Sequence, residues 1–244
     1  MTATPGTPRP RGIRNQLRRW HIWLGWIVAI PFLLWTVSGV VMVLKPIEEV
    51  RGEGLLSEAP TLPFGLKPVP PAIGPRKVAA LKLEARAEGP RWIVTYADGA
   101  ARLADATTGR LLPPLTAADA ARAVEARYAG EAKLGAVDRI DGANPPSDFR
   151  RPLDAWRVSM SDGTRFYVHA ATGEIVAKRT GWWRIYDFMF GLHIMDVQTR
   201  EDSHNPLVIG FGIVSMVTTV LAIVLLPLTI RRRRKKAAPA PGER

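Results

Sequence analysis

The chain has 244 residues, a net charge of +12 at pH 7 and no cysteine. Its charge is concentrated at the ends: residues 1–20 contain five arginines and no acid, and residues 231–244 contain seven basic residues and one acid. The lack of cysteine excludes disulfides, iron–sulfur clusters and thioether-linked haem. The basic tails also lack the interleaved aromatic residues that favour nucleic-acid binding, so nucleic acid is not an expected partner.

The first long apolar run begins directly after Arg19 and ends at Leu44, with the sequence WHIWLGWIVAIPFLLWTVSGVVMVL. A run of this length without charge is long enough to cross a bilayer as a helix. The polar stretch KPIEEV follows it in place of a small-x-small cleavage site, so we expect an uncleaved signal anchor. His21 lies at the start of this run, where a histidine is costly unless it has a partner or meets water.

The stretch after the first run is rich in proline and reads APTLPFGLKPVPPAIGP within residues 46–75. It predicts an extended tether without a core of its own. An internal repeat comes next, in which residues 91–112 align without gaps on residues 155–176. Each copy predicts a hairpin with an Asp-Gly turn, at Asp98-Gly99 and at Asp162-Gly163, and then a short third strand after the shared ATG.

A helix is expected between the two copies, in the segment LTAADAARAVEARYAG. Thr116 and Asp119 are spaced like a capping box at its start, and Gly130 is a candidate stop. The segment GWWRIYDFMFGLHIMD then predicts an amphipathic helix at the membrane interface. Asn205 and Pro206 provide a cap and a first-turn proline for a second apolar run that reaches Ile230.

The charges predict the orientation of the two spans. The tails carry +5 and +6, which leaves +1 of the total +12 for everything between them. By the positive-inside rule, both termini should be cytoplasmic and touch anionic membrane lipid, and the central domain should be periplasmic. The expected parts are a basic tail and first span (1–45), a tether (46–75), a periplasmic domain (76–180, with repeat units of about 76–113 and 114–180), an interfacial segment (181–204), and a second span with a basic tail (205–244).

Four features in this order resemble the PepSY-associated transmembrane helix family. They are RRWHIWLGW at the first span, the doubled DG…ATG unit, the approach YDFMFGLH, and the glycine-containing second span. The resemblance implies a multi-pass protein of the bacterial inner membrane, with two transmembrane α-helices flanking an extracytoplasmic α+β PepSY-type domain that holds two repeated small antiparallel sheet units. It also implies a link to iron uptake, because larger members with four or more spans resemble haem-containing ferrisiderophore reductases. Their haem-ligand positions, H-x-W-x-G and GLH, correspond here to His21 and His193.

The two histidines cannot share one iron within a single chain of this topology. His21 and His193 are expected on opposite sides of a hydrocarbon core of roughly 30 Å, whereas two axial nitrogens lie about 4 Å apart across an iron, given metal–nitrogen distances of roughly 2 Å. A homodimer or a partner membrane subunit removes the difficulty, since each histidine could face its counterpart across its own haem b. Gly25, one turn after His21, would clear space for a flat ring or for another helix. The alternative for each histidine is an interfacial polar side chain without a cofactor.

A second cluster offers a different metal site, with five candidate ligands just before the second span: His193, Asp196, Glu201, Asp202 and His204. Imidazoles and carboxylates at this density could hold iron, zinc or copper, but the spacing fits no defined motif, and a solvated acidic turn explains it better. His169 stands where the first repeat has Asp105, so we expect a surface or edge residue there.

No nucleophile–base arrangement or nucleotide-binding loop is present, so the sequence leaves open whether the protein is an enzyme. The leading hypothesis is haem-dependent electron transfer in iron or siderophore handling, by a dimer or with a partner, and with a ferrisiderophore as a candidate substrate. The alternative is a non-catalytic, membrane-anchored module that binds or restrains a periplasmic protein.

Overall fold

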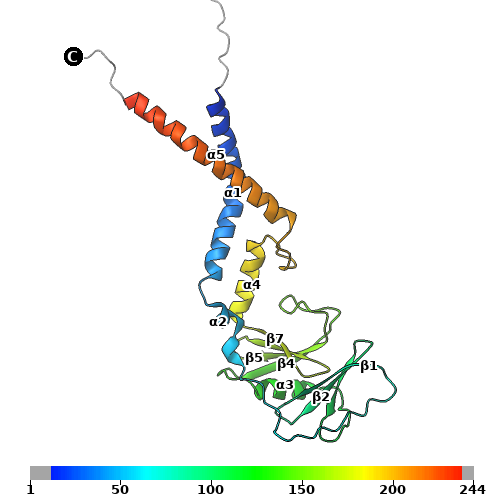
Figure 1. Ribbon diagram of the computed structural model, residues 1–244. Coiled ribbons are helices and arrows are strands. Elements are labelled where there is room, and N and C mark those ends of the chain that lie inside the picture. The colour runs from blue at the N-terminus through cyan, green and yellow to red at the C-terminus, as the bar shows by residue number, and fades with distance from the viewer. Residues whose placement is uncertain (1–11, 238–244) are drawn as a thin grey trace, which may run out of the picture. The chain divides into compact units, whose positions relative to one another are not determined.

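The computed structural model describes residues 12–237, which form two compact units (Figure 1). We call the first the membrane unit; it comprises the chain up to Leu44 and from Asp187 onward. The second, the central unit, comprises Lys45–Tyr186. The parts of the predicted basic tails at residues 1–11 and 238–244 lie outside the described residues.

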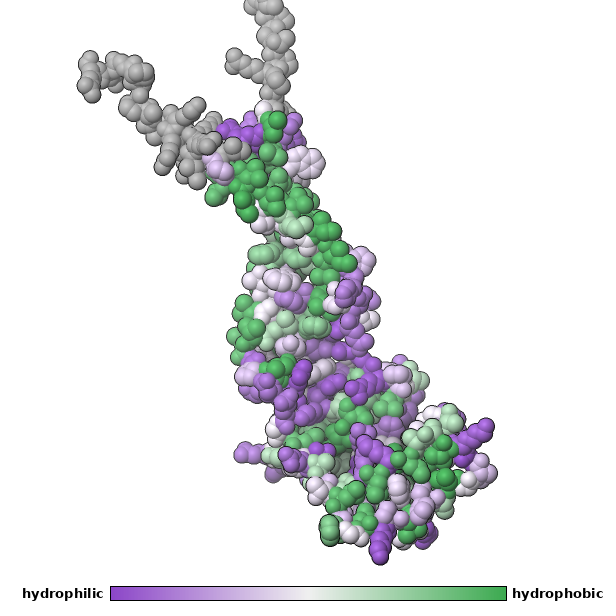
Figure 2. Space-filling model, viewed as in Figure 1, coloured by the Kyte–Doolittle hydropathy of each residue, from purple (hydrophilic) through white to green (hydrophobic). Residues whose placement is uncertain are grey.

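The membrane unit is built on two long apolar helices, α1 (Ile13–Met42) and α5 (Pro206–Ala237). They run antiparallel, so the start of α1 and the end of α5 lie at the same end of the unit (Figure 1). Hydrophobic residues gather over both helices (Figure 2), and large apolar side chains such as Trp26, Ile30 and Ile223 are exposed. Exposed apolar surface on helices of this length suits lipid, and the two predicted spans are confirmed as long apolar helices.

The start of α5 carries the predicted cap. The Asn205 side-chain oxygen accepts hydrogen bonds from the backbone N–H groups of Leu207 and Val208, each at 3.1 Å. The side-chain nitrogen of Asn205 donates to the carbonyl oxygens of Ile194 and Asp202. Asn205 therefore both begins α5 and fixes the turn that precedes it.

The central unit contains two antiparallel sheets and short helices. Its elements in chain order are α2 (Ile47–Arg51), a 3-10 turn η1 (Glu53–Leu55), β1 (Val78–Glu84), β2 (Arg91–Tyr96), β3 (Ala101–Asp105), α3 (Ala117–Glu125), β4 (Leu134–Ile140), β5 (Ala155–Met160), β6 (Arg165–His169) and β7 (Ile175–Arg179). Helix α4 (Gly181–His193) comes after β7, and the chain passes into the membrane unit within it. The strand orders are β1-β2-β3 and β4-β5-β6-β7, which confirms the α+β region with two small antiparallel sheets.

The two copies of the repeat pair their strands in the same register. In the first copy Arg91 pairs with Asp105 and Trp92 with Ala104; 64 residues later, Ala155 pairs with His169 and Trp156 with Val168. The correspondence continues to the other end of each hairpin. Trp92 and Trp156 therefore occupy equivalent positions in the two sheets, as the alignment predicts.

Both Asp-Gly pairs form hairpin turns, with a loop one residue longer than the expected two. Gly99 donates its N–H to the Tyr96 carbonyl at 3.0 Å, and Gly163 donates to Met160 at 2.9 Å. Both glycines are left-handed, with φ of 84° and 80°. A type I turn followed by a left-handed glycine is the usual three-residue hairpin, and the aspartate side chain of each loop accepts a further backbone N–H.

The copies differ in the chain segment after the hairpin. In the second copy β7 adds a full third strand to β6, whereas in the first copy the chain after Thr108-Gly109 makes a single bridge, Ala104 to Leu111. Pro113 and Pro114 stand in the first copy where Ala177 and Lys178 stand in β7. Because proline has no N–H to donate, the third strand of the first copy ends early.

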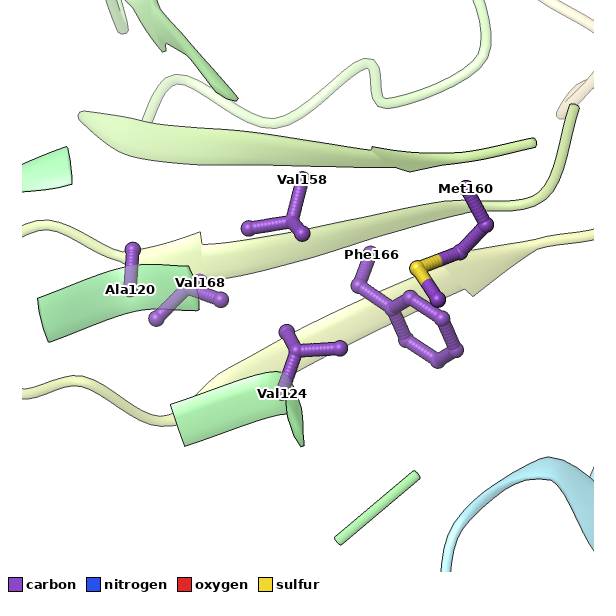
Figure 3. Packing of buried hydrophobic residues seen from close by; sticks show 6 residues of the cluster. All are labelled: Ala120, Val124, Val158, Met160, Phe166 and Val168. Carbon is purple, nitrogen blue, oxygen red and sulfur yellow. The ribbon is translucent and has the colours of Figure 1, made fainter. Parts of the chain in front are cut away.

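The main core of the central unit lies between α3 and the second sheet. Ala120 and Val124 of α3 face Val158, Phe166 and Val168 on β5 and β6 (Figure 3). The predicted capping box of α3 is present, with Thr116 and Asp119 bonding each other's backbone N–H groups. The helix ends at Glu125, before the predicted stop at Gly130, because the chain turns there to pair Tyr128 with Leu56.

The proline-rich stretch is extended, and its later part is fixed to the first copy of the repeat. The N–H of Val69 donates to the Ala106 carbonyl and the N–H of Ala72 donates to the Gly109 carbonyl, both at 2.8 Å. The Trp92 indole N–H donates to the Val69 carbonyl at the same distance. This stretch has little internal structure, and the first sheet supplies its hydrogen-bond partners.

Candidate functional site

His193 is the histidine with the most specific surroundings in the membrane unit. It ends α4 and lies against α1, where its ring stacks on Trp35 with centroids 4.5 Å apart and an interplanar angle of 23°. Its Nδ1 is 3.1 Å from the Ser38 hydroxyl and 3.2 Å from the Trp35 carbonyl oxygen. A Cβ added at Gly39 would approach the ring to 3.3 Å, so glycine leaves room for the imidazole. Trp35, Ser38 and Gly39 together form a cradle for one ring.

The partners of Nδ1 determine which ring nitrogen carries the proton. The Ser38 hydroxyl donates its hydrogen to the Trp35 carbonyl at 2.9 Å, so its oxygen is left as an acceptor toward His193. A carbonyl oxygen can only accept. Nδ1 of His193 therefore carries a hydrogen, and in the neutral ring Nε2 has a free lone pair. This arrangement, with one nitrogen held at a backbone carbonyl and the other available, is the usual one for a histidine that binds a metal.

His21 lies near the opposite end of α1 and is less constrained. Its Nδ1 is buried and has no hydrogen-bond partner within the part of the chain that the structure describes. Gly25, one turn later, has no atom near the position where a Cβ would be, so this face of α1 is open. A buried polar nitrogen without a partner is unfavourable, and such groups often mark a missing ligand or neighbour.

His21 and the α1 residues that hold His193 are far apart along α1. With a rise of about 1.5 Å per helical residue, Trp35 and Gly39 lie about 21 and 27 Å along α1 from His21. Since His193 is held at Trp35 and Gly39, it cannot approach His21 within one chain. The inference from sequence that they cannot share one iron agrees with this separation.

The chain matches the family described as the PepSY-associated TM region over residues 18–243. It belongs to this family. No curated protein and no solved structure matches the chain. The match covers both apolar helices and the whole central unit, so the histidine cradle and the repeated sheets are parts of one PepSY-associated membrane protein.

The second candidate cluster of this PepSY protein, in the turn between α4 and α5, is not assembled as a metal site. Across residues 12–237, no three potential histidine, cysteine or carboxylate ligands come together. Asp196 instead accepts from the hydroxyl and N–H of Thr199 and from the N–H groups of Glu201 and Asp202, and these bonds hold the pKa of its carboxyl below the ordinary value. His204 is exposed and its Nδ1 lies 3.4 Å from the neighbouring Ser203 hydroxyl. The geometry is that of a hydrogen-bonded turn.

His169, in the second copy of the PepSY repeat, has the same structural role as Asp105 in the first copy. Its Nδ1 accepts the N–H groups of Ala171 and Thr172, at 3.0 and 3.1 Å. Asp105 accepts the N–H groups two and three residues further on in the same way. His169 is half-buried, and its burial lowers its pKa. His169 in the second copy therefore preserves the turn that Asp105 makes in the first, and the difference does not indicate a binding site.

Sequence reasoning identified His193 as a candidate ligand. It missed that Trp35, Ser38 and Gly39 bind this histidine. The available signal was the spacing W-x-x-S-G in the first span, which puts an aromatic ring, a hydroxyl and a gap on one side of a helix. Only the fold shows that His193 occupies the space beside Gly39.

Proposed function

We propose that this protein is an electron carrier of the bacterial inner membrane that serves iron or siderophore handling and uses haem b. The observation that supports this most is the hydrogen-bonded His193 ring, whose Nδ1 is fixed at the Trp35 carbonyl and whose Nε2 is left with a lone pair. The family membership provides the membrane setting.

The residues fit haem as single axial ligands. His193 offers Nε2 from a ring held by stacking and two hydrogen bonds, and His21 offers an imidazole beside the open surface at Gly25. We assign no second ligand to either site from the same chain, because His193 is held at Trp35 and Gly39, too far along α1 from His21 for the two histidines to share one iron. His193 and His21 are the residues that would hold haem b, and the haem would supply one-electron chemistry.

A second copy of the chain is the simplest source of the missing ligands. Two protomers related by a two-fold axis present His193 to His193 at one end and His21 to His21 at the other. Four apolar helices then enclose the cofactors, as in other helical bundles that hold them. A partner membrane subunit with its own histidines would serve the same purpose.

The charge distribution supports a cytoplasmic position for both termini and a periplasmic position for the central unit. A reporter that is active only outside the cytoplasm tests this orientation when it is fused within residues 60–175. That fusion is expected to be active, and the same reporter fused at Arg244 is expected to be inactive. Activity at Arg244 alone would reverse the orientation.

Histidine variants test the haem ligands. His193→Ala and His21→Ala should each remove one haem signal from the purified protein, while both variants still insert into the membrane. His204→Ala is the matched control, because this exposed histidine lies in the adjacent turn and has no cradle. Ser38→Ala removes one acceptor for His193 and should weaken haem retention at that site alone.

The same wild-type and variant proteins also distinguish the two functional hypotheses. Full haem content in both His193→Ala and His21→Ala would refute the ligand assignment. A wild-type protein that contains no haem would favour the other hypothesis, a non-catalytic PepSY module that binds a periplasmic protein.

A further inference from the structure

The central unit contains a cavity of about 650 Å³ between the two copies of the repeat. One wall is the first sheet unit, with Leu83 of β1 and Leu103 of β3. The opposite wall is α3 and the start of β7, represented by Ala123 and Ile175. The size falls within the range of about 300–1,000 Å³ that is typical of small-molecule sites.

The two walls are held together by Arg86. Its guanidinium donates to the carbonyl oxygens of Gly173 at 2.9 Å and Thr172 at 3.2 Å, and it pairs with Glu84 at 2.8 Å. These bonds join the loop after β1 to the ATG turn of the second copy. The cavity is therefore a fixed part of the fold of the central unit.

The cavity surface is mainly aliphatic. Its larger apolar side chains are Leu62, Leu83, Leu103, Leu112, Leu115 and Ile175, and none of its lining residues is aromatic. A surface of this kind favours an alkyl chain, since it offers area for apolar burial and no ring for stacking. The first copy leaves its leucines uncovered because its third strand stops at Pro113.

Four arginines line the cavity, and three of them are neutralised by acids. Arg86 pairs with Glu84, Arg91 with Asp105 at 2.6 Å, and Arg122 with Asp119. The fourth, Arg127, donates from Nε and Nη2 to the Ser57 carbonyl at 3.2 and 2.7 Å. Because this acceptor is neutral, the positive charge of Arg127 is not cancelled by its hydrogen bonds.

The positive charge of Arg127 affects the pKa of a neighbouring lysine. Burial lowers the pKa of Lys178; the charge of Glu53 opposes this, and the charge of Arg127 adds a smaller lowering. Two other lining carboxylates, Glu88 and Glu174, are exposed, and Glu174 acts on the Lys82 ammonium. Arg127 is therefore the lining cation best placed to accept an additional anion.

We propose that this cavity binds an aliphatic carboxylate, with its alkyl chain on the leucines and its carboxylate on Arg127. The lining residues contain no histidine or cysteine, and their one hydroxyl, that of Thr172, belongs to a buried residue. The site is therefore a binding site without a nucleophile–base pair. It is separate from the histidines of the membrane unit and does not depend on the haem proposal.

The test uses the full chain in lipid nanodiscs and 8,8,8-trifluorooctanoate as a fluorine NMR probe. The trifluoro alcohol and the trifluoro amine of the same chain length are the comparison ligands. The alcohol measures binding through the alkyl chain alone, and the amine shows whether the site prefers a negative or a positive charge. We expect the carboxylate to bind at least about tenfold more tightly than the alcohol, since charge-assisted hydrogen bonds are stronger than neutral ones. Tighter binding of the amine than of the carboxylate would overturn the proposal.

Two variants with matched controls locate the probe. Leu103→Asn should abolish binding of both carboxylate and alcohol, whereas Leu81→Asn, on the exposed β1 surface outside the cavity, should not. Arg127→Gln should weaken the carboxylate at least about tenfold and leave the alcohol unchanged, and the exposed Arg110→Gln should change neither. The alcohol reports an intact cavity, so a folding defect in Arg127→Gln is recognised directly. Equal carboxylate binding by wild type, Leu103→Asn and Arg127→Gln would refute the site.

Competition with unlabelled ligands distinguishes two sources of the same chemistry. Octanoate represents a lipid-derived acid, and the tripeptide Ala-Ala-Leu represents a protein C-terminus with an aliphatic side chain. Displacement of the probe by either one supports the proposal and names the source. Failure of both to displace it at concentrations well above the dissociation constant of the probe would contradict it.

Discussion

The two copies of the repeat share a strand register and differ in the elements that pack against them. Both hairpins turn at Asp-Gly, and both close with a side-chain acceptor at the end of the second strand. The second copy then gains α3 on one face and β7 at its edge, and the largest buried cluster of the unit lies there. The first copy stops at Pro113 and leaves leucines beside a cavity. The same hairpin thus forms part of the core in one copy and the wall of a cavity in the other.

The largest expected difference between the copies comes from removing the side chain at equivalent positions of the hairpins. Phe166 is fully buried, whereas the residue at its place in the first copy, Arg102, is half-buried and donates to the Leu112 carbonyl. Phe166→Ala should reduce the free energy of unfolding of the central unit by about 3–5 kcal/mol, and Arg102→Ala by about 1 kcal/mol. Chemical denaturation followed by tryptophan fluorescence measures both. Equal losses would mean that the two copies contribute equally to the core.

The hairpin turns should respond alike in the two copies. Gly99→Ala and Gly163→Ala each force a side chain into a left-handed conformation, which costs about 1–2 kcal/mol. Gly54→Ala is the control, because no atom lies near its Cβ position and its φ is not in the left-handed range. The midpoint of thermal unfolding should fall by similar amounts in the two turn variants and stay unchanged in the control. A large fall in only one copy would show that the turns are not equivalent.

The smallest effect is a pH dependence confined to the second copy. Burial lowers the pKa of His169, against the opposing charges of Glu174 and Asp154. Its neutral Nδ1 accepts two N–H groups, and these bonds stabilise the folded state. This stabilisation is complete above the ordinary histidine pKa of about 6.5, and it is lost as the pH falls through the lower folded-state pKa of His169. The loss should be about 1 kcal/mol.

His169→Asp should remove this pH dependence, because the bonds from Thr107, with help from the charge of Arg91, lower the pKa of the equivalent Asp105 to about 2. Thermal unfolding between pH 8 and pH 5 compares the two proteins. An identical decline in both would assign the pH dependence to another group.

Much of the fold was predictable because its signals are local or repeated. The uncharged runs predict the two spans, and the matched residues at a fixed offset predict the two sheets. The end of α3 was not predictable from Gly130, since a long-range pairing of Tyr128 with Leu56 determines it. The docking of the proline-rich stretch depends likewise on partners more than thirty residues away, such as Ala106.

The candidate site was predictable only in part. The family resemblance points to His21 and His193 because each lies in a recognisable motif. The cradle of Trp35, Ser38 and Gly39 was not predictable, because it arises where α4 meets α1. Arg127 was not identified either, since its significance comes from the neutral partner that it binds. Contacts between elements distant in sequence determine both sites.

The most direct test of the central claim is a reduced-minus-oxidised absorbance spectrum of the purified wild-type protein. We predict the spectrum of a haem b with two axial histidines, in a preparation whose mass corresponds to at least two chains or to a complex with a partner subunit. A haem-free protein that is correctly folded and inserted would contradict it, and His193 and His21 would then be polar side chains without a cofactor.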